Sequence, residues 1–149
     1  MTEEQVTKCI LTWLENNGWS IISFDFPQSG TGYQIHLNDA FKKTKNKGSF
    51  IPDIVASKNN NVVFFENKDR FVLSDFDKIE NLKLNNDYSE GISKLLSNLK
   101  SPTIYFGIGM PFSIKNSTKS DNYKGKVDFI IFIDEHLKNI VYHQIENIF

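Results

Sequence analysis

Near the start of the chain, hydrophobic residues recur every three or four positions, which is the period of an amphipathic helix. These residues are Val6, Cys9, Ile10, Trp13 and Leu14. The preceding Thr2-Glu3-Glu4-Gln5 has the pattern of a capping box, and Gly18 suits the left-handed conformation that ends many helices. The sequence therefore predicts a first helix that begins after Thr2 and stops at residues 16–18, with Cys9 in the core.

Runs of β-branched and aromatic residues predict strands further along the chain. We expect strands at residues 19–26, 51–56, 62–68, 103–108, 127–133 and 139–144. A helical region is expected from Ser74, and a clear helix over residues 89–100. Residues 38–45 fit either a short helix or a basic loop, and residues 115–125 are expected to form a polar loop. This order predicts one mixed α/β domain over residues 1–149, with a central β-sheet flanked by helices.

Two of the predicted strands are close enough in sequence to form a hairpin. If Asn59 and Asn60 form a two-residue turn, Lys58 faces Asn61 and Asp53 lies directly across from Glu66. Directly opposed residues share one face of a sheet, with Cβ atoms about 4.5–5.5 Å apart. Lys68 is two residues beyond Glu66 and points to the same face.

This arrangement fits metal-assisted hydrolysis. Two carboxylates that close repel each other unless a cation lies between them, and oxygen ligands of this kind suit Mg²⁺. A bound metal offsets charge that develops on a phosphate and lowers the pKa of a bound water. Lys68 can hold that water, stabilise hydroxide, or relay a proton if its own pKa is depressed. The alternative is that Asp53 and Glu66 are ordinary charges at strand ends.

Pro52-Asp53 and Glu66-Asn67-Lys68, with twelve residues between the two acids, resemble the motif of the PD-(D/E)XK nuclease superfamily. The order of the expected elements over residues 1–110 is also similar. The resemblance implies a restriction-endonuclease-like fold, Mg²⁺ (or Mn²⁺) held by Asp53 and Glu66, and cleavage of DNA. It also implies a further acid on the first helix, which Glu4 or Glu3 would supply. Asn67 departs from the pattern, since many members carry an apolar residue there.

Candidate nucleic-acid contacts precede the motif. The lysine run Lys42, Lys43, Lys45 and Lys47 could bind phosphates, and Gln34 could contact bases or the backbone. The alternative is a solvated lysine loop and a Gln34 that only shapes its own loop. Tyr33, Tyr105 and Tyr123 could stack on unpaired bases, although their spacing does not require it.

Composition narrows the class of protein. One cysteine excludes a disulfide framework within the chain, and neither a signal peptide nor an apolar run of membrane-spanning length is present, so we expect a cytoplasmic protein. The formal net charge of −1 argues mildly against strong non-specific binding to nucleic acid. The lysines are segregated, however, and a second cluster occurs at Lys115, Lys119, Lys124 and Lys126.

The function expected from these features is a small Mg²⁺-dependent DNA endonuclease of restriction or defence type. A junction-resolving or repair nuclease, and a nuclease acting on RNA or single strands, are the catalytic alternatives. The alternative from another class is a nucleic-acid-binding or assembly subunit without cleavage. Because so little chain remains for a recognition module, we expect a homodimer, with a separate specificity protein as a further possible partner.

Overall fold

The computed structural model describes residues 1–39, 48–136, 138–144 and 147–149. Its elements, in chain order, are α1 (Glu3–Asn16), β1 (Ser20–Phe24), β2 (Ile54–Lys58), β3 (Asn61–Asn67), α2 (Leu73–Leu84), α3 (Ser89–Leu95), β4 (Thr103–Pro111), α4 (Ile114–Asp121), the short 3₁₀ helix η2 (Lys124–Lys126), β5 (Phe129–Ile133) and β6 (Ile140–Gln144). None of the helices within these ranges is long and apolar enough to cross a membrane.

The described strands form one mixed sheet in the order β1-β2-β3-β4-β5-β6. The first three strands are antiparallel, β4 is parallel to β3, β5 is parallel to β4, and β6 returns antiparallel to β5. Helices α2 and α3 form the connection from β3 to β4, and α4 lies in the connection from β4 to β5. Such crossovers are what parallel neighbours require, and they confirm the predicted α/β class with a central sheet.

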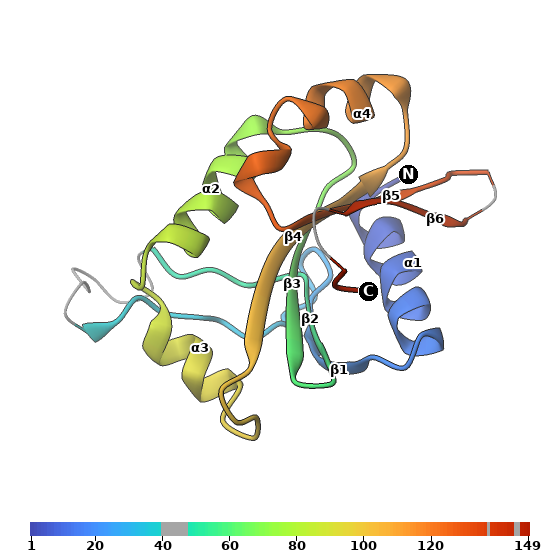
Figure 1. Cartoon of the computed structure of the whole chain (residues 1–149). Helices are drawn as coiled ribbons and strands as arrows, with labels where there is room; N and C mark the ends of the chain where they lie inside the picture. The colour runs from blue at the N-terminus through green and yellow to red at the C-terminus, as the bar shows by residue number, and fades with distance from the viewer. Residues whose placement is uncertain (40–47, 137, 145–146) are drawn as a thin grey trace.

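The sheet separates two hydrophobic cores, because successive side chains of a strand point to opposite faces. On β3, Val63 and Phe65 pack with α1, while Val62 and Phe64 pack with α2 and α3. Figure 1 shows α1 on one side of the sheet and α2 and α3 on the other. β3 is covered on both faces, which explains its continuous apolar run.

The predicted first helix is confirmed, and so are the residues at which it begins and ends. Thr2 accepts a hydrogen bond from the backbone N–H of Gln5, the Gln5 side chain accepts one from the Thr2 N–H, and Gly18 has a φ of +82°. Val6, Ile10 and Leu14 are buried against the sheet, and Cys9 packs beside them only partly buried.

The segment expected to be a polar loop at residues 115–125 is instead mostly helical, as α4 and η2, so that prediction was wrong. Ser113 caps α4 by accepting a hydrogen bond from the backbone N–H of Asn116. The buried residues of α4 are Asn116 and Ser120. Since its inward face is polar, α4 has no apolar periodicity that would identify it in the sequence.

Three other boundaries differ from the prediction by three residues or more. β2 begins at Ile54 instead of residue 51, in line with the missing N–H of Pro52. The helix predicted over residues 89–100 ends at Leu95, and β4 continues to Pro111. The helix or loop considered for residues 38–45 lies almost wholly outside the described residues.

Candidate active site

The β2–β3 hairpin has the turn and register expected from the sequence. Asn59 and Asn60 have φ values of +51° and +64°, which a two-residue hairpin turn of type I′ needs and Asn tolerates. Lys58 pairs with Asn61, and the register continues to Ile54 opposite Phe65. Because of this pairing, the residues before Ile54 and those after Phe65 lie at the same end of the sheet.

Asp53 lies at that end and is anchored to β3 through two hydrogen bonds. Its backbone N–H donates to the carbonyl of Phe65 (2.9 Å), and its carboxylate oxygen Oδ2 accepts from the backbone N–H of Asn67 (2.6 Å). By strand alternation Asp53 shares a face with Val55, which packs in the core beneath α2. The structure thus brings the Asp53 carboxylate beside the segment that carries Glu66.

Glu66 is buried, and both of its carboxylate oxygens are paired with lysines. Oε1 lies 3.1 Å from the Nζ of Lys68, and Oε2 accepts a hydrogen bond from the Nζ of Lys78 (2.9 Å). Lys78 belongs to α2, so this pair ties the end of β3 to the helix that follows it. The motif at residues 66–68 did not indicate Lys78.

The first helix contributes Glu3 to the cluster. Glu3 Oε1 lies 3.7 Å from the Nζ of Lys68. Glu4, named together with Glu3 as a candidate from the sequence, pairs instead with Lys8 one turn along α1, at 2.5 Å. The Glu4 side chain therefore binds a residue of its own helix, and Glu3 is the acid of α1 that contacts Lys68.

Asp75, in the first turn of α2, is a further acid that sequence reasoning missed. Its oxygen Oδ2 is buried and has no hydrogen-bond partner among the described residues. Asp75 and Lys78 are three residues apart and therefore lie on one face of α2. This spacing could have linked Asp75 to the site from the sequence, but only if the contact between Lys78 and Glu66 had been known.

Negative charge is in excess in this cluster. With every group ionised, four carboxylates (Glu3, Asp53, Glu66, Asp75) face two ammonium groups (Lys68, Lys78). Burial and the neighbouring Glu66 charge raise the pKa of Asp53 to about 7, against the lowering effects of the Asn67 N–H and Lys68. Burial, together with the charges of Glu66 and Glu3, likewise raises the pKa of Asp75.

The carboxylates that favour the neutral form of Asp53 favour the charged form of Lys68. Burial alone would lower the pKa of Lys68, but the carboxylates of Glu66, Asp75 and Glu3 raise it above its ordinary value. The Lys68 side chain therefore stays an ammonium ion at neutral pH. In the cation-free protein this favours the roles of a fixed positive charge over the proton-relay role, which needs a depressed pKa.

The carboxylates of this cluster are of the type that divalent cations prefer as ligands. Carboxylate oxygens suit Mg²⁺, and two positive charges would offset the excess of acids. No group of three or more acidic, histidine or cysteine side chains in the described part of the chain is arranged as a metal site. Because both Glu66 oxygens are paired with lysines, a cation at Asp53 and Glu66 would compete with these lysines for Glu66.

A buried polar contact supports the site from the face of α1. Asn67 is fully buried, and its side-chain amide donates to the hydroxyl of Thr7 on α1 (2.9 Å). The backbone N–H of Lys68 donates to the carbonyl of Gly109 on β4 (2.9 Å). Asn67, which departs from the apolar pattern of the family it resembles, therefore links β3 to α1.

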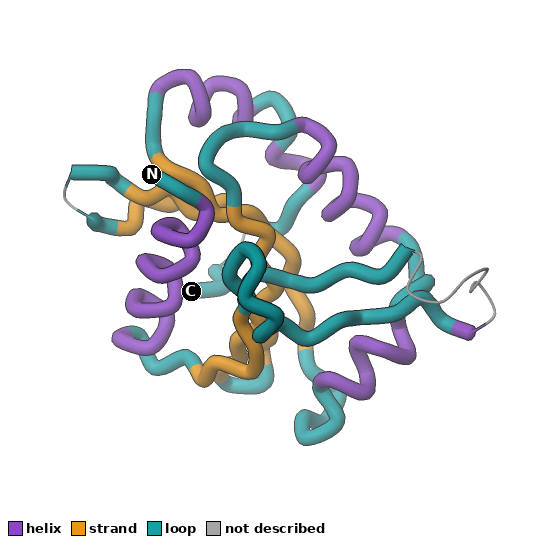
Figure 2. The backbone as a smooth tube through the Cα atoms, turned by 180° about the vertical axis from the view of Figure 1, so that it is seen from behind, coloured by secondary structure: helices purple, strands orange, loops and turns teal. Residues whose placement is uncertain are grey.

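The predicted nucleic-acid contacts are only partly described. Lys42, Lys43, Lys45 and Lys47 lie outside the described residues. Gln34 donates a hydrogen bond to Ser49 (2.7 Å), beside the bridge that pairs Ile35 with Phe50. Figure 2 shows the two extended segments on either side of the grey trace running side by side. Tyr105 and Tyr123 pack against the cores, in agreement with a structural role.

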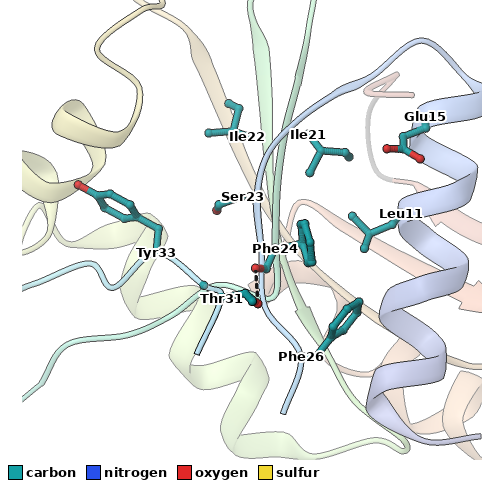
Figure 3. A pocket seen from close by; sticks show the side chains of 10 residues that line it. Leu11, Glu15, Ile21, Ile22, Ser23, Phe24, Phe26, Thr31 and Tyr33 are labelled. Carbon is teal, nitrogen blue, oxygen red and sulfur yellow. Dashed lines mark hydrogen bonds between the residues drawn. The ribbon is translucent and has the colours of Figure 1, made fainter. Parts of the chain in front are cut away.

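A cleft of about 630 Å³ runs along β1, the edge strand next to β2. Figure 3 shows Leu11 and Phe24 on one side of the strand and Tyr33 on the other, with Thr31 donating a hydrogen bond to the Phe24 carbonyl (3.3 Å). The loop after β1 reaches the acidic cluster, because the Asp25 N–H donates to the carbonyl of Asp53 (2.9 Å). The cleft itself is lined by none of the clustered charges.

Comparison of the chain with models of protein families, with curated proteins and with solved structures found no match.

Proposed function

We propose that the chain is a Mg²⁺-dependent nuclease of the PD-(D/E)XK type that hydrolyses phosphodiester bonds in DNA. The observation that carries the proposal is the convergence of Asp53, Glu66 and Lys68 at one end of the sheet, within a cluster that has more carboxylates than lysines. The supporting observations are the hairpin register and the mixed sheet, both of which agree with the resemblance of the motif.

The roles of the residues follow from their charges. Asp53 and Glu66 would hold the cation, which supplies an activated water and offsets charge on the phosphate when bound. Lys68 would orient the attacking water and stabilise developing negative charge as a permanent cation. Glu3 would keep Lys68 in place from α1. The proton of the water would leave to solvent or to a substrate phosphate oxygen, because Lys68 is already protonated.

DNA as the substrate, a homodimer and a restriction or defence role are expectations from the resemblance of the motif. A junction-resolving or repair nuclease uses the same chemistry and remains the alternative within this class.

The rival function is a binding or assembly subunit without cleavage. The observation that favours it is the pairing of both Glu66 oxygens with Lys68 and Lys78, which satisfies that buried carboxylate without a cation. The excess of carboxylates and the buried, unpartnered oxygen of Asp75 favour the nuclease, because a purely structural ion cluster gains nothing from either.

The test is cleavage of supercoiled plasmid by the purified protein in Mg²⁺ or Mn²⁺ against EDTA. Wild type is expected to nick or linearise the plasmid only with the cation, and Asp53→Ala and Lys68→Ala are expected to lose this. Lys83→Ala is the matched control, since Lys83 lies on α2 and pairs with Asp128 (2.8 Å), outside the cluster. Cleavage that survives Asp53→Ala would show that the site is elsewhere.

A further inference from the structure

Lys78 binds the Glu66 carboxylate and would compete there with a divalent cation. Its Nζ lies 2.9 Å from Oε2, while Lys68 is on Oε1. The Lys78 side chain is 38% exposed, whereas that of Lys68 is 21% exposed. Lys68 is also held by Glu3. Of the two lysines, Lys78 is therefore the one that can leave Glu66 at the lower cost.

Asp75 offers a displaced Lys78 a new partner. It lies one helical turn before Lys78, at a spacing that favours ion pairs along a helix. Its oxygen Oδ2 is buried and unpartnered among the described residues, which is unfavourable for a carboxylate and is relieved by any donor. Lys78 of α2 therefore has one acceptor, Glu66, in the present structure, and a second possible acceptor, Asp75, on the same face of its own helix.

We propose that Lys78 holds the place of the divalent cation on Glu66 in the cation-free protein, and that Asp75 receives Lys78 when the cation binds. This inference rests on the proposed function, because it assumes that Glu66 binds a cation. It assigns Lys78 and Asp75 as positioning residues: Lys78 competes with the cation, and Asp75 lowers the cost of its displacement.

The test is a double-mutant cycle read by Mn²⁺ binding, measured by calorimetry without any nucleic acid. Lys78→Met removes the competitor and is expected to tighten Mn²⁺ binding roughly fivefold, the factor that corresponds to one partly exposed ion pair. Asp75→Asn removes the receiving acid and is expected to weaken binding by a similar factor. In the Lys78→Met background, Asp75→Asn is expected to change binding by less than about twofold, because no lysine has to be received.

Three controls separate this coupling from general effects of charge and folding. Lys83→Met removes another paired lysine of α2 and is expected to leave Mn²⁺ binding within about twofold of wild type. Circular-dichroism melting of each variant identifies any that fails to fold. The conservative Lys78→Arg, which keeps the competing charge, is expected to bind Mn²⁺ no more tightly than wild type.

The outcomes are distinguishable. If wild type binds Mn²⁺ but Lys78→Met binds it no more tightly, the competition is overturned while the proposed nuclease stands. If Asp75→Asn weakens binding equally in both backgrounds, Asp75 acts on the cation directly and the receiving role is overturned. If wild type binds no Mn²⁺ and Asp53→Ala behaves in the same way, both this inference and the proposed metal site fail.

Discussion

At the scale of single residues, the acidic cluster gives Asp53 and Lys68 opposite behaviours. The same excess of carboxylates that raises the pKa of Asp53 to about 7 also raises the pKa of Lys68. Asp53 is therefore close to half-protonated at neutral pH, while Lys68 remains charged. A cation that binds there must displace a proton from Asp53, so its affinity is expected to increase as the pH rises through 7.

Asp53 also makes the stability of the cation-free protein depend on pH. Its folded-state pKa of about 7 lies above the ordinary value of 3.8, so the folded state holds its proton more tightly than the unfolded state does. Stability is therefore expected to fall as the pH rises from about 4 to about 7, because the unfolded state then binds fewer protons. Asp53→Asn, which keeps the acceptor for the Asn67 N–H, is expected to remove this slope. It should stabilise the cation-free protein by on the order of 2 kcal/mol at pH 8, after discounting for partial exposure.

Urea unfolding in EDTA at pH 4.5, 6 and 8 measures this effect. Asp77→Asn is a suitable control, because Asp77 is an exposed residue of α2 that pairs with Lys126 of η2 (2.7 Å). Equal pH slopes for wild type and Asp53→Asn would contradict the burial and charge repulsion assigned to Asp53.

At the scale of elements, the site depends on a close approach of β3, β4 and α1. Gly109 on β4 pairs with Asn67 on β3. A Cβ at Gly109 would lie 2.3 Å from the Oδ1 of Asn67 and 2.3 Å from a methyl group of Ile10 on α1. Glycine is needed here for space, since any larger residue would push α1 or the Asn67 amide away.

Gly109→Ala is expected to destabilise the protein by about 2 kcal/mol, because over-packing a filled core costs roughly 1–3 kcal/mol. It should also weaken Mn²⁺ binding, since it displaces the segment that carries Glu66 and Lys68. Gly125→Ala is the matched control, with no atom within 4 Å of the added Cβ, and should change stability by less than about 0.5 kcal/mol. Equal unfolding midpoints for the two variants would contradict the packing described for β4.

The elements that could be predicted are those whose pattern reflects an apolar face. The capping box and apolar stripe of α1 and the Asn-Asn turn of the hairpin depend on local chemistry, which the sequence displays directly. α4 could not be predicted, because its buried face consists of Asn116 and Ser120. Asn116 accepts a hydrogen bond from the Phe71 N–H and donates to the Pro111 carbonyl, partners that only the folded chain provides.

At the scale of the whole molecule, the site is assembled from both faces of the sheet. Asp53, Glu66 and Lys68 come from the hairpin and could be placed from its register. Glu3 could not be distinguished from Glu4, because the choice depends on how α1 is rotated against the sheet. Asp75 and Lys78 could not be found at all, because they reach the cluster only through the packing of α2 on β4 and β3.

This arrangement places the end of β3 between the start of α1 and the start of α2 (Figure 1). The ion pairs of Glu3 with Lys68 and of Lys78 with Glu66 join the three elements at one point. The charged cluster therefore lies at an end of the sheet, next to the hydrophobic cores.

The most direct test of the proposed nuclease site is the single-turnover rate of cleavage of end-labelled DNA in Mg²⁺, for wild type, Glu66→Gln and Glu80→Gln. Substrates with a duplex, a four-way junction and a single strand cover the alternatives within the nuclease class. Glu80 lies on α2 and pairs with Lys126, so Glu80→Gln controls for the loss of a paired carboxylate outside the cluster. We expect Mg²⁺-dependent cleavage of at least one substrate, slowed by about 100-fold or more in Glu66→Gln and unchanged in Glu80→Gln. Cleavage that persists in Glu66→Gln, or no cleavage of any substrate by wild type, would contradict the proposed site.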